Sequence, residues 1–199
     1  MGISIRRIAV FLDRDGVINS HCGTDKFGNP ESPLRFEDFQ IFPFVGDSIK
    51  KINALGFIVL IATNQPAVAK GKMTLDVLNK MHTALLDKVL KAGGRIDKIY
   101  TCLHHPDPKQ VVNLHLLKEC ECRKPKPGML LRAASEFNID LKRSWMIGDS
   151  WRDITAGKSA KCKTILIAPS AQNSAMCSPD ATAKNLEEAV KIIEKEKIK

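Results

Sequence analysis

The sequence predicts an α/β fold, a three-layer sandwich whose central, mainly parallel sheet carries helices on both faces. Short apolar runs without polar alternation, typical of strands buried on both faces, occur at residues 8–12, 57–62 and 164–168. Segments with apolar residues at helical spacing separate them, at 45–55 and 74–91. The chain has 199 residues, 44% of them hydrophobic and 27% charged, and can bury one sizeable core. We therefore expect a single domain over residues 1–199.

Two carboxylates end the first strand. Asp13 and Asp15 follow the run 8–12 directly, and because alternate residues of a strand point the same way, both lie on one side. An open α/β sheet places its ligands at the carboxyl ends of its strands. Two acids so close repel each other unless a cation or a shared proton relieves them, so we expect a ligand site here.

The second strand, 57–62, ends in a Thr-Asn-Gln triplet that begins at Thr63, whose hydroxyl and backbone amides can hold phosphate oxygens. Before it, residues 21–33 are rich in turn formers and predict a loop above the site. Residues 45–55 predict a helix closed by Gly56. Because the segment between the two strands contains no second core, we expect no large cap domain.

Thr74 is the expected N-cap of a long helix that runs to about Lys91. The side chains expected on its buried side are Leu75, Leu78, Leu85, Leu86, Val89 and Leu90. A third strand over residues 96–101 follows this helix and leads into the second chemical feature of the chain.

That feature is a group of four residues with metal-ligand spacing. Cys102 and His104 form one close pair, and Cys120 and Cys122 form another after a loop. Three thiols and one imidazole match the ligand set of tetrahedral zinc. The sequence therefore predicts a zinc site.

His105 and His115 are alternative ligands, but the Cys-x-His spacing of His104 mirrors the Cys-x-Cys pair better. Because four protein ligands leave no position open for water, we predict a structural rather than a catalytic zinc. It would tie off an inserted loop at about residues 102–122 and so fix the basic residues that begin at Arg123.

A further strand is expected at 145–148, and it ends in Gly-Asp, with Asp149 followed four residues later by Asp153. The elements expected after it are a short helix at 154–160, a strand at 164–168, a surface loop at 171–180 and a final helix with a capping box that begins at Asn185.

The chain carries a net charge of +9 and has a pI near 9.3. Such a surface can steer an anionic substrate or bind nucleic acid. Part of the charge lies in a Lys/Glu tail at 191–199, which is typical of a solvated helix face. With 6% aromatic residues and one Tyr, the stacking platforms of single-strand binders are not evident, so we do not expect nucleic acid as the main partner.

No apolar stretch approaches the roughly 20 residues that span a bilayer, and residues 1–7 lack the apolar run of a signal peptide. We therefore expect a cytoplasmic protein with no membrane partner. In that reducing compartment we expect no disulfides among the six cysteines. We further expect a monomer.

In order, the chain offers a strand with Asp-x-Asp, a strand with Thr, a loop Lys at position 124 and a strand with Gly-Asp-x-x-x-Asp. That order of parts resembles the haloacid dehalogenase superfamily of phosphotransferases. The four motifs span roughly residues 8 to 153. The resemblance implies a Rossmann-like fold and phosphoryl-transfer chemistry.

A narrower resemblance comes from the Cys-x-His and Cys-x-Cys pairs taken with the segments that begin at Phe11, Thr63 and Cys122. Together they resemble the branch of histidinol phosphatases and heptose bisphosphate phosphatases. The long loop between the two pairs resembles that of the D-glycero-D-manno-heptose 1,7-bisphosphate 7-phosphatases more than that of the histidinol phosphatases. These relatives are capless, magnesium-dependent enzymes of surface-polysaccharide precursor synthesis. The chain departs from their pattern at Pro66, where Ser is common, and at Ser150, where Lys is frequent.

The resemblance also implies roles for the matching residues. Asp13 would be the nucleophile that forms an aspartyl-phosphate, and Asp15 the general acid and then the base. Thr63 and Lys124 would stabilise the transferring phosphoryl group. Magnesium would be held by Asp13, Asp149 and the backbone carbonyl of Asp15.

Arg123 would bind the distal phosphate of a bisphosphate through its fork of donors. Asp153 would orient Lys124 or a metal-bound water rather than ligate the ion. The other substrate contacts that the resemblance implies are Arg14, His21, Cys22, Gly23 and Thr24 near the first strand, and Asn64, Gln65 and Pro66 after the second.

The sequence therefore predicts a magnesium-dependent phosphatase of a small phosphorylated sugar, with D-glycero-D-manno-heptose 1,7-bisphosphate, cleaved at the 7-phosphate, as the expected substrate. Within the family, the alternatives are a histidinol-phosphate phosphatase and a polynucleotide 3′-phosphatase, the latter favoured by the positive charge. An alternative of another class is a non-catalytic binding module whose loop is held together by zinc. The full set of phosphotransfer residues argues against this alternative.

Overall fold

A computed structural model describes residues 6–24, 30–168 and 177–197. Within these residues, parallel strands form one open sheet in the order β3-β2-β1-β4-β5-β6. The strands are β1 (Ala9–Leu12), β2 (Ile58–Asn64), β3 (Lys98–Cys102), β4 (Trp145–Gly148), β5 (Lys163–Ile167) and β6 (Ala181–Ala183). The predicted parallel α/β sheet is confirmed.

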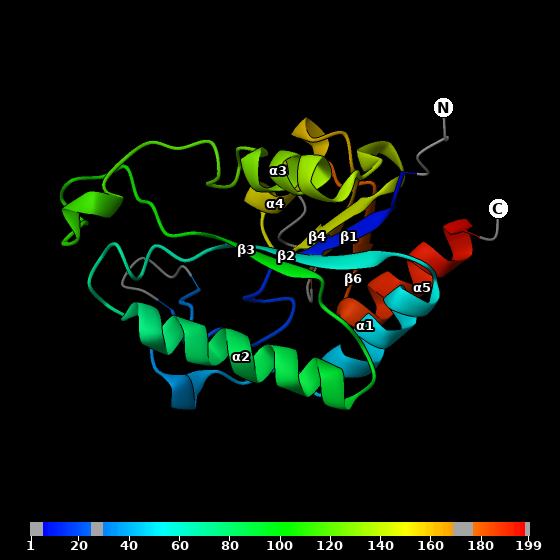
Figure 1. Ribbon diagram of the computed structural model, residues 1–199, viewed down its shortest axis with the longest axis horizontal. Coiled ribbons are helices and arrows are strands. Elements are labelled where there is room, and N and C mark those ends of the chain that lie inside the picture. The colour runs from blue at the N-terminus through cyan, green and yellow to red at the C-terminus, as the bar shows by residue number, and fades with distance from the viewer. Residues whose placement is uncertain (1–5, 25–29, 169–176, 198–199) are drawn as a thin grey trace.

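Helices cover both faces of the sheet, as Figure 1 shows. They are α1 (Val45–Ala54), α2 (Leu75–Lys91), α3 (Gly128–Phe137), α4 (Trp151–Ser159) and α5 (Leu186–Lys197). Helices α1, α2 and α5 pack their apolar side chains against one face, and α3 packs against the other, where α4 also lies. The predicted three-layer arrangement is therefore correct.

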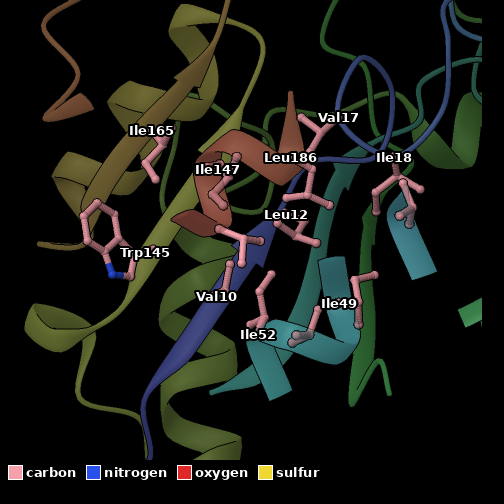
Figure 2. Packing of buried hydrophobic residues seen from close by; sticks show 14 of the residues in the cluster. Val10, Leu12, Val17, Ile18, Ile49, Ile52, Trp145, Ile147, Ile165 and Leu186 are labelled. Carbon is pink, nitrogen blue, oxygen red and sulfur yellow. The ribbon is translucent and has the colours of Figure 1, made fainter. Parts of the chain in front are cut away.

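Strand β1 lies in the centre of the sheet, and none of its four side chains is exposed. Val10 and Leu12 point toward α1 and α5, where Figure 2 shows them beside Ile49 and Leu186. Ala9 and Phe11 join the opposite core, with α3. Burial of each large aliphatic side chain stabilises the fold by about 1.5–3 kcal/mol, so the strand that delivers Asp13 is held firmly from both sides.

Helix α2 begins and ends as predicted, with the Thr74 hydroxyl accepting a hydrogen bond from the Val77 amide at 3.2 Å. The predicted buried side of α2 included three leucines that the structure leaves exposed. The leucines at 75, 86 and 90 are exposed by 48%, 40% and 70%, whereas the buried stripe is formed by Leu78, Met81, Leu85 and Val89. The stripe is narrow because α2 lies at the surface and packs mainly on α1, so only residues spaced by three or four positions are covered.

Helix α3 and strand β6 were not predicted. Strand β6 has three residues, Ala181-Thr182-Ala183, with too little apolar pattern to be recognised. Two predicted loops fall partly outside the described residues, at positions 25–29 of the loop 21–33 and 171–176 of the loop 171–180. At the start of α5, the Asn185 side chain accepts from the Glu188 amide at 3.0 Å, which is one half of the predicted capping box. The Glu188 carboxylate accepts from the Lys184 amide at 2.7 Å, so the box is not closed through the Asn185 amide.

Between β1 and β2, the described residues form a short 3-10 helix, Phe36–Asp38, and α1, with no strand of a second sheet. The carboxyl end of β1 is therefore not covered by a second folded unit from this part of the described chain. In the part of the chain that the structure describes, no helix has the length and apolar character needed to cross a membrane.

Candidate active site

Carboxylates from two adjacent strands meet at the carboxyl edge of the sheet. Asp13 follows β1, and Asp149 follows β4, the neighbour of β1. Oxygen atoms of Asp13, Asp149 and Asp153 all lie within 4.8 Å of one another. The sheet topology thus brings together two of the predicted magnesium ligands and the acid predicted to lie beside them.

Lys124 completes this cluster from the loop before α3. Its side chain is almost fully buried, and its Nζ lies 2.9 Å from Asp13 Oδ1 and 2.5 Å from Asp153 Oδ1. The other oxygen of Asp153 accepts hydrogen bonds from the Ser150 amide and hydroxyl at the start of α4. Asp153 is therefore placed to orient Lys124, as predicted.

The electrostatics of the cluster favour a bound cation. Burial raises the pKa of Asp13 to about 8, an effect that Lys124 opposes and that Asp153 and Asp149 strengthen. Burial lowers the pKa of Lys124, but the attraction of Asp13 and Asp153 prevails and raises it. A group of buried carboxylate oxygens with too little compensating positive charge suits a hard cation such as Mg²⁺.

Asp15 lies in a different environment. Its carboxylate accepts hydrogen bonds from Arg14 Nη2 at 2.8 Å, Asn19 Nδ2 at 2.9 Å and Gln65 Nε2 at 2.8 Å. Burial raises its pKa, but Arg14 and these hydrogen bonds outweigh burial and lower it below the usual value. The two motif acids therefore have pKa values shifted in opposite directions, which is typical of carboxylates with different roles.

The Arg14 side chain has no exposed surface, and its guanidinium stacks over the Phe39 ring at 5.3 Å. This placement contradicts the predicted contact between that side chain and the substrate. The physical reason is the buried charge of Asp15, which needs a fixed cation behind it. Asn19, which also holds Asp15, was missed, although its position four residues after the motif acid could have indicated it.

The Thr-Asn-Gln triplet after β2 positions other groups of the site. Gln65 Nε2 donates to Thr63 Oγ1 at 2.9 Å as well as to Asp15. Asn64 clamps the backbone of Lys124, donating to its carbonyl at 3.0 Å and accepting from its amide at 3.1 Å. The side chains of Asn64 and Gln65, predicted as substrate contacts, are thus engaged with the protein, and Pro66 follows them half-buried.

Residues after β1 reach the same edge. His21 Nε2 lies 2.8 Å from Asp149 Oδ2, and this hydrogen bond is the main cause that raises the pKa of His21. Cys22, Gly23 and Thr24 are exposed, with the Cys22 thiol donating to the Asp38 carbonyl at 3.2 Å. The structure therefore brings His21 to the carboxylate cluster, whereas it places Cys22 to Thr24 on the surface.

The four predicted zinc ligands converge. Sγ of Cys122 lies 3.3 Å from Sγ of Cys102, 3.3 Å from Sγ of Cys120 and 3.3 Å from Nδ1 of His104. Sγ of Cys102 lies 3.6 Å from Sγ of Cys120 and 3.8 Å from Nδ1 of His104. Ligands of a tetrahedral zinc lie roughly 3.5–3.8 Å apart, so two of these distances match such an ion and the three around Cys122 are slightly shorter.

The competing histidines lie elsewhere. His105 Nδ1 accepts from the Asp107 amide at 3.2 Å, and His115 is exposed. Burial, followed by the neighbouring thiol of Cys122, raises the pKa of Cys102, a cost that a bound cation would offset. His104 is therefore the histidine of the cluster.

Arg123 follows the cluster directly and lies half-buried, with Nη1 donating to the His104 carbonyl at 3.3 Å. It lines a cleft of about 400 Å³ together with Lys124 and Arg152. Arg152, from the first turn of α4, was not among the predicted site residues, because nothing in the local sequence indicated that α4 begins beside Arg123.

Gly16 of the first motif has a φ of +81°, and a Cβ there would lie 2.1 Å from Asp149 Oδ2 and 2.8 Å from His21 Nε2. Gly16→Ala is therefore expected to displace Asp149, to lower kcat/KM at least tenfold and to destabilise the fold by about 1–3 kcal/mol. Denaturant unfolding and phosphate-release assays measure both effects. Gly56→Ala is the control, since Gly56 has a similar φ of +83° and a Cβ there would lie 3.6 Å from the nearest atom. Equal activity of the two variants would contradict the prediction.

The fold and this site together define a HAD-like hydrolase, and a family model described as HAD-hydrolase-like matches residues 121–189. Curated relatives match far more of the chain. The D-glycero-beta-D-manno-heptose-1,7-bisphosphate 7-phosphatase of Rhodopseudomonas palustris is 39% identical over 155 residues, which cover 78% of this chain and 80% of the relative. The corresponding alpha-heptose phosphatase of Campylobacter jejuni is 37% identical over 159 residues, covering 80% and 81%.

A solved structure of D,D-heptose 1,7-bisphosphate phosphatase from B. bronchiseptica, complexed with magnesium and phosphate, superimposes with a TM-score of 0.78 at 26% identity. The match covers 95% of this chain and 99% of that one. The chain belongs to the family of heptose 1,7-bisphosphate 7-phosphatases, and it is a phosphoric monoester hydrolase.

Proposed function

We propose that this enzyme removes the 7-phosphate from D-glycero-D-manno-heptose 1,7-bisphosphate. The convergence of Asp13, Asp149 and Lys124 at one edge of the sheet is the observation that carries the proposal, since it supplies a nucleophile, a cation site and a fixed positive charge together. Relatives named for the beta and the alpha heptose are both similar to this chain, so the proposal includes either anomer.

In the first step, an oxygen of Asp13 attacks the phosphorus atom and forms an aspartyl-phosphate, while Asp15 gives a proton to the leaving sugar oxygen. In the second step, Asp15 takes a proton from the water that attacks this phosphate. This attack breaks the bond between Asp13 and phosphorus and releases phosphate. The lowered pKa of Asp15 favours the anion that the second step needs and disfavours the protonated form that the first step needs. Thr63 and Lys124 stabilise the charge on the phosphoryl oxygens.

Magnesium fits the oxygen-rich cluster and would be held by Asp13, Asp149 and the backbone carbonyl of Asp15. When bound, it supplies positive charge that allows an anionic carboxylate to approach an anionic phosphate. Lys124 contributes a second cation, and its contact with Asp13 orients the attacking carboxylate.

Zinc bound by Cys102, His104, Cys120 and Cys122 would be structural, since the four ligands fill a tetrahedral shell. It would fix the loop 102–122 and, through Cys122, the residue that follows it. Arg123 would then bind the distal phosphate of the sugar. A cytoplasmic location and a monomeric state stay predictions from the sequence.

The test is phosphate release by the purified protein with magnesium. The substrates compared are the two anomers of heptose 1,7-bisphosphate, histidinol phosphate and a 3′-phosphorylated oligonucleotide. We expect the highest kcat/KM for one heptose bisphosphate. A higher kcat/KM for histidinol phosphate or for the oligonucleotide would overturn the proposal and identify the alternative substrate.

A further inference from the structure

A cleft of about 400 Å³ lies between the zinc-ligand loop and the start of α4. Its lining is unusually cationic for a small pocket. The charged residues that line it are Lys118, Arg123, Lys124, Lys126 and Arg152, together with the acidic Glu119. Lys124 is paired with Asp13 and Asp153, and Lys126 with Glu121. Among the described residues, Lys118, Arg123 and Arg152 form no ion pair, so the cleft suits a small anion.

The cleft adjoins the carboxylate cluster through Lys124, although the three acids of the cluster do not line it. Lys124 lines it, and the Nζ atom of the same residue lies 2.9 Å from Asp13 Oδ1. A small molecule whose reacting phosphate lies at Asp13 therefore extends into the cleft with the part that does not react.

Two guanidinium groups line this cleft, one from each side. Arg123 is attached to the cysteine cluster, whereas Arg152 projects from the first turn of α4 and stacks over the Trp151 ring at 5.1 Å. Burial lowers the pKa of Arg123, and the positive charge of Arg152 lowers it further. In the described parts of the chain, neither guanidinium forms an ion pair with a carboxylate.

Two cations that face one cleft without an acidic partner repel each other unless an anion lies between them. Guanidinium groups bind phosphate through paired, charge-assisted hydrogen bonds. A cation–π contact with the Trp151 ring restrains the Arg152 guanidinium beside the cleft.

We propose that Arg152, together with Arg123, binds the second phosphate of the substrate and so makes the enzyme select small bisphosphates over monophosphates. This inference rests on the proposed function and names a binding residue in α4 that the sequence did not indicate. Arg152 sets specificity: it adds affinity for a phosphate that takes no part in the reaction.

The test compares heptose 1,7-bisphosphate with heptose 7-phosphate, which lacks only the second phosphate. The ratio of their kcat/KM values measures the selection. Arg152→Ala is expected to lower this ratio about tenfold or more, through the KM for the bisphosphate, and Arg152→Lys to lower it less, because one charge stays. Lys158→Ala is the matched control, since it removes a cation from the last turn of the same helix, outside the cleft.

A ratio in Arg152→Ala equal to that of the wild type would overturn the inference, and so would an equal loss of kcat/KM for both substrates, which indicates a structural role. Calorimetric binding of both sugars to Asp13→Asn protein, with and without Arg152→Ala, gives the ratio of affinities without turnover. Failure of the wild type to hydrolyse the heptose bisphosphate therefore counts against the proposed function, and an unchanged ratio of affinities counts against Arg152.

Discussion

Asp13→Asn is expected to lower kcat for phosphate release by about 10⁴-fold or more, because an amide does not attack phosphorus to form the aspartyl intermediate. The variant should keep its fold. Asn has almost the same shape as Asp and can still accept the hydrogen bond that the Arg14 amide donates to Oδ1 at 2.7 Å. It also removes one negative charge from a buried group of acids whose repulsion raises the pKa of Asp13.

Steady-state assays with the heptose bisphosphate measure kcat, and circular dichroism with thermal melting checks the fold. The control is Asp47→Asn, which neutralises an exposed carboxylate in the first turn of α1. The enzymatic account fails if Asp13→Asn folds and retains activity within tenfold of the wild type. A non-catalytic binding module, the alternative from another class, would show no turnover in either form.

The sequence predicted the parts of this site that follow buried strands. Asp13, Thr63 and Asp149 could be placed because short apolar runs are recognisable and because parallel strands end at one edge of the sheet. The four residues of the Cys/His cluster could be found because their chemistry and spacing suffice without tertiary structure.

The remaining parts depend on packing between distant segments, which a local pattern does not report. Arg14 looked like a substrate contact beside the motif acids, but the buried charge of Asp15 draws its side chain inward. Arg152 and Arg123 are far apart in sequence and meet only because α4 begins beside the loop that carries Arg123. The same limit explains why the exposed leucines of α2 were predicted as buried.

Two independent supports hold Lys124 in place. Asn64 clamps the Lys124 backbone from the end of β2 through two hydrogen bonds. The cysteine cluster fixes the preceding residues, and the Gly128 amide donates to the Glu121 carbonyl at 3.0 Å, which closes the loop before α3. A buried, doubly paired lysine needs such support, because a small displacement of its backbone would leave Asp13 and Asp153 without this cation.

Cys102→Ser is therefore expected to act on catalysis as well as on metal content. Zinc bound to the purified protein should fall from about one ion per chain to near zero, since a hydroxyl is a poor zinc ligand at neutral pH. The loop 102–122 should become more susceptible to proteolysis, and kcat/KM should fall at least tenfold as Arg123 and Lys124 lose their support. Elemental analysis, limited proteolysis and the heptose bisphosphate assay measure the three effects.

The matched control is Cys162→Ser, which changes a buried thiol outside the cluster and should retain zinc. A Cys102→Ser protein that keeps its full metal content would contradict the zinc assignment. Loss of zinc with full activity would leave the assignment intact but would show that Asn64 alone positions Lys124. The two supports can then be separated with Asn64→Ala, alone and combined with Cys102→Ser. Because Lys124 is held from both sides, the loss of one support should lower kcat/KM less than the loss of both.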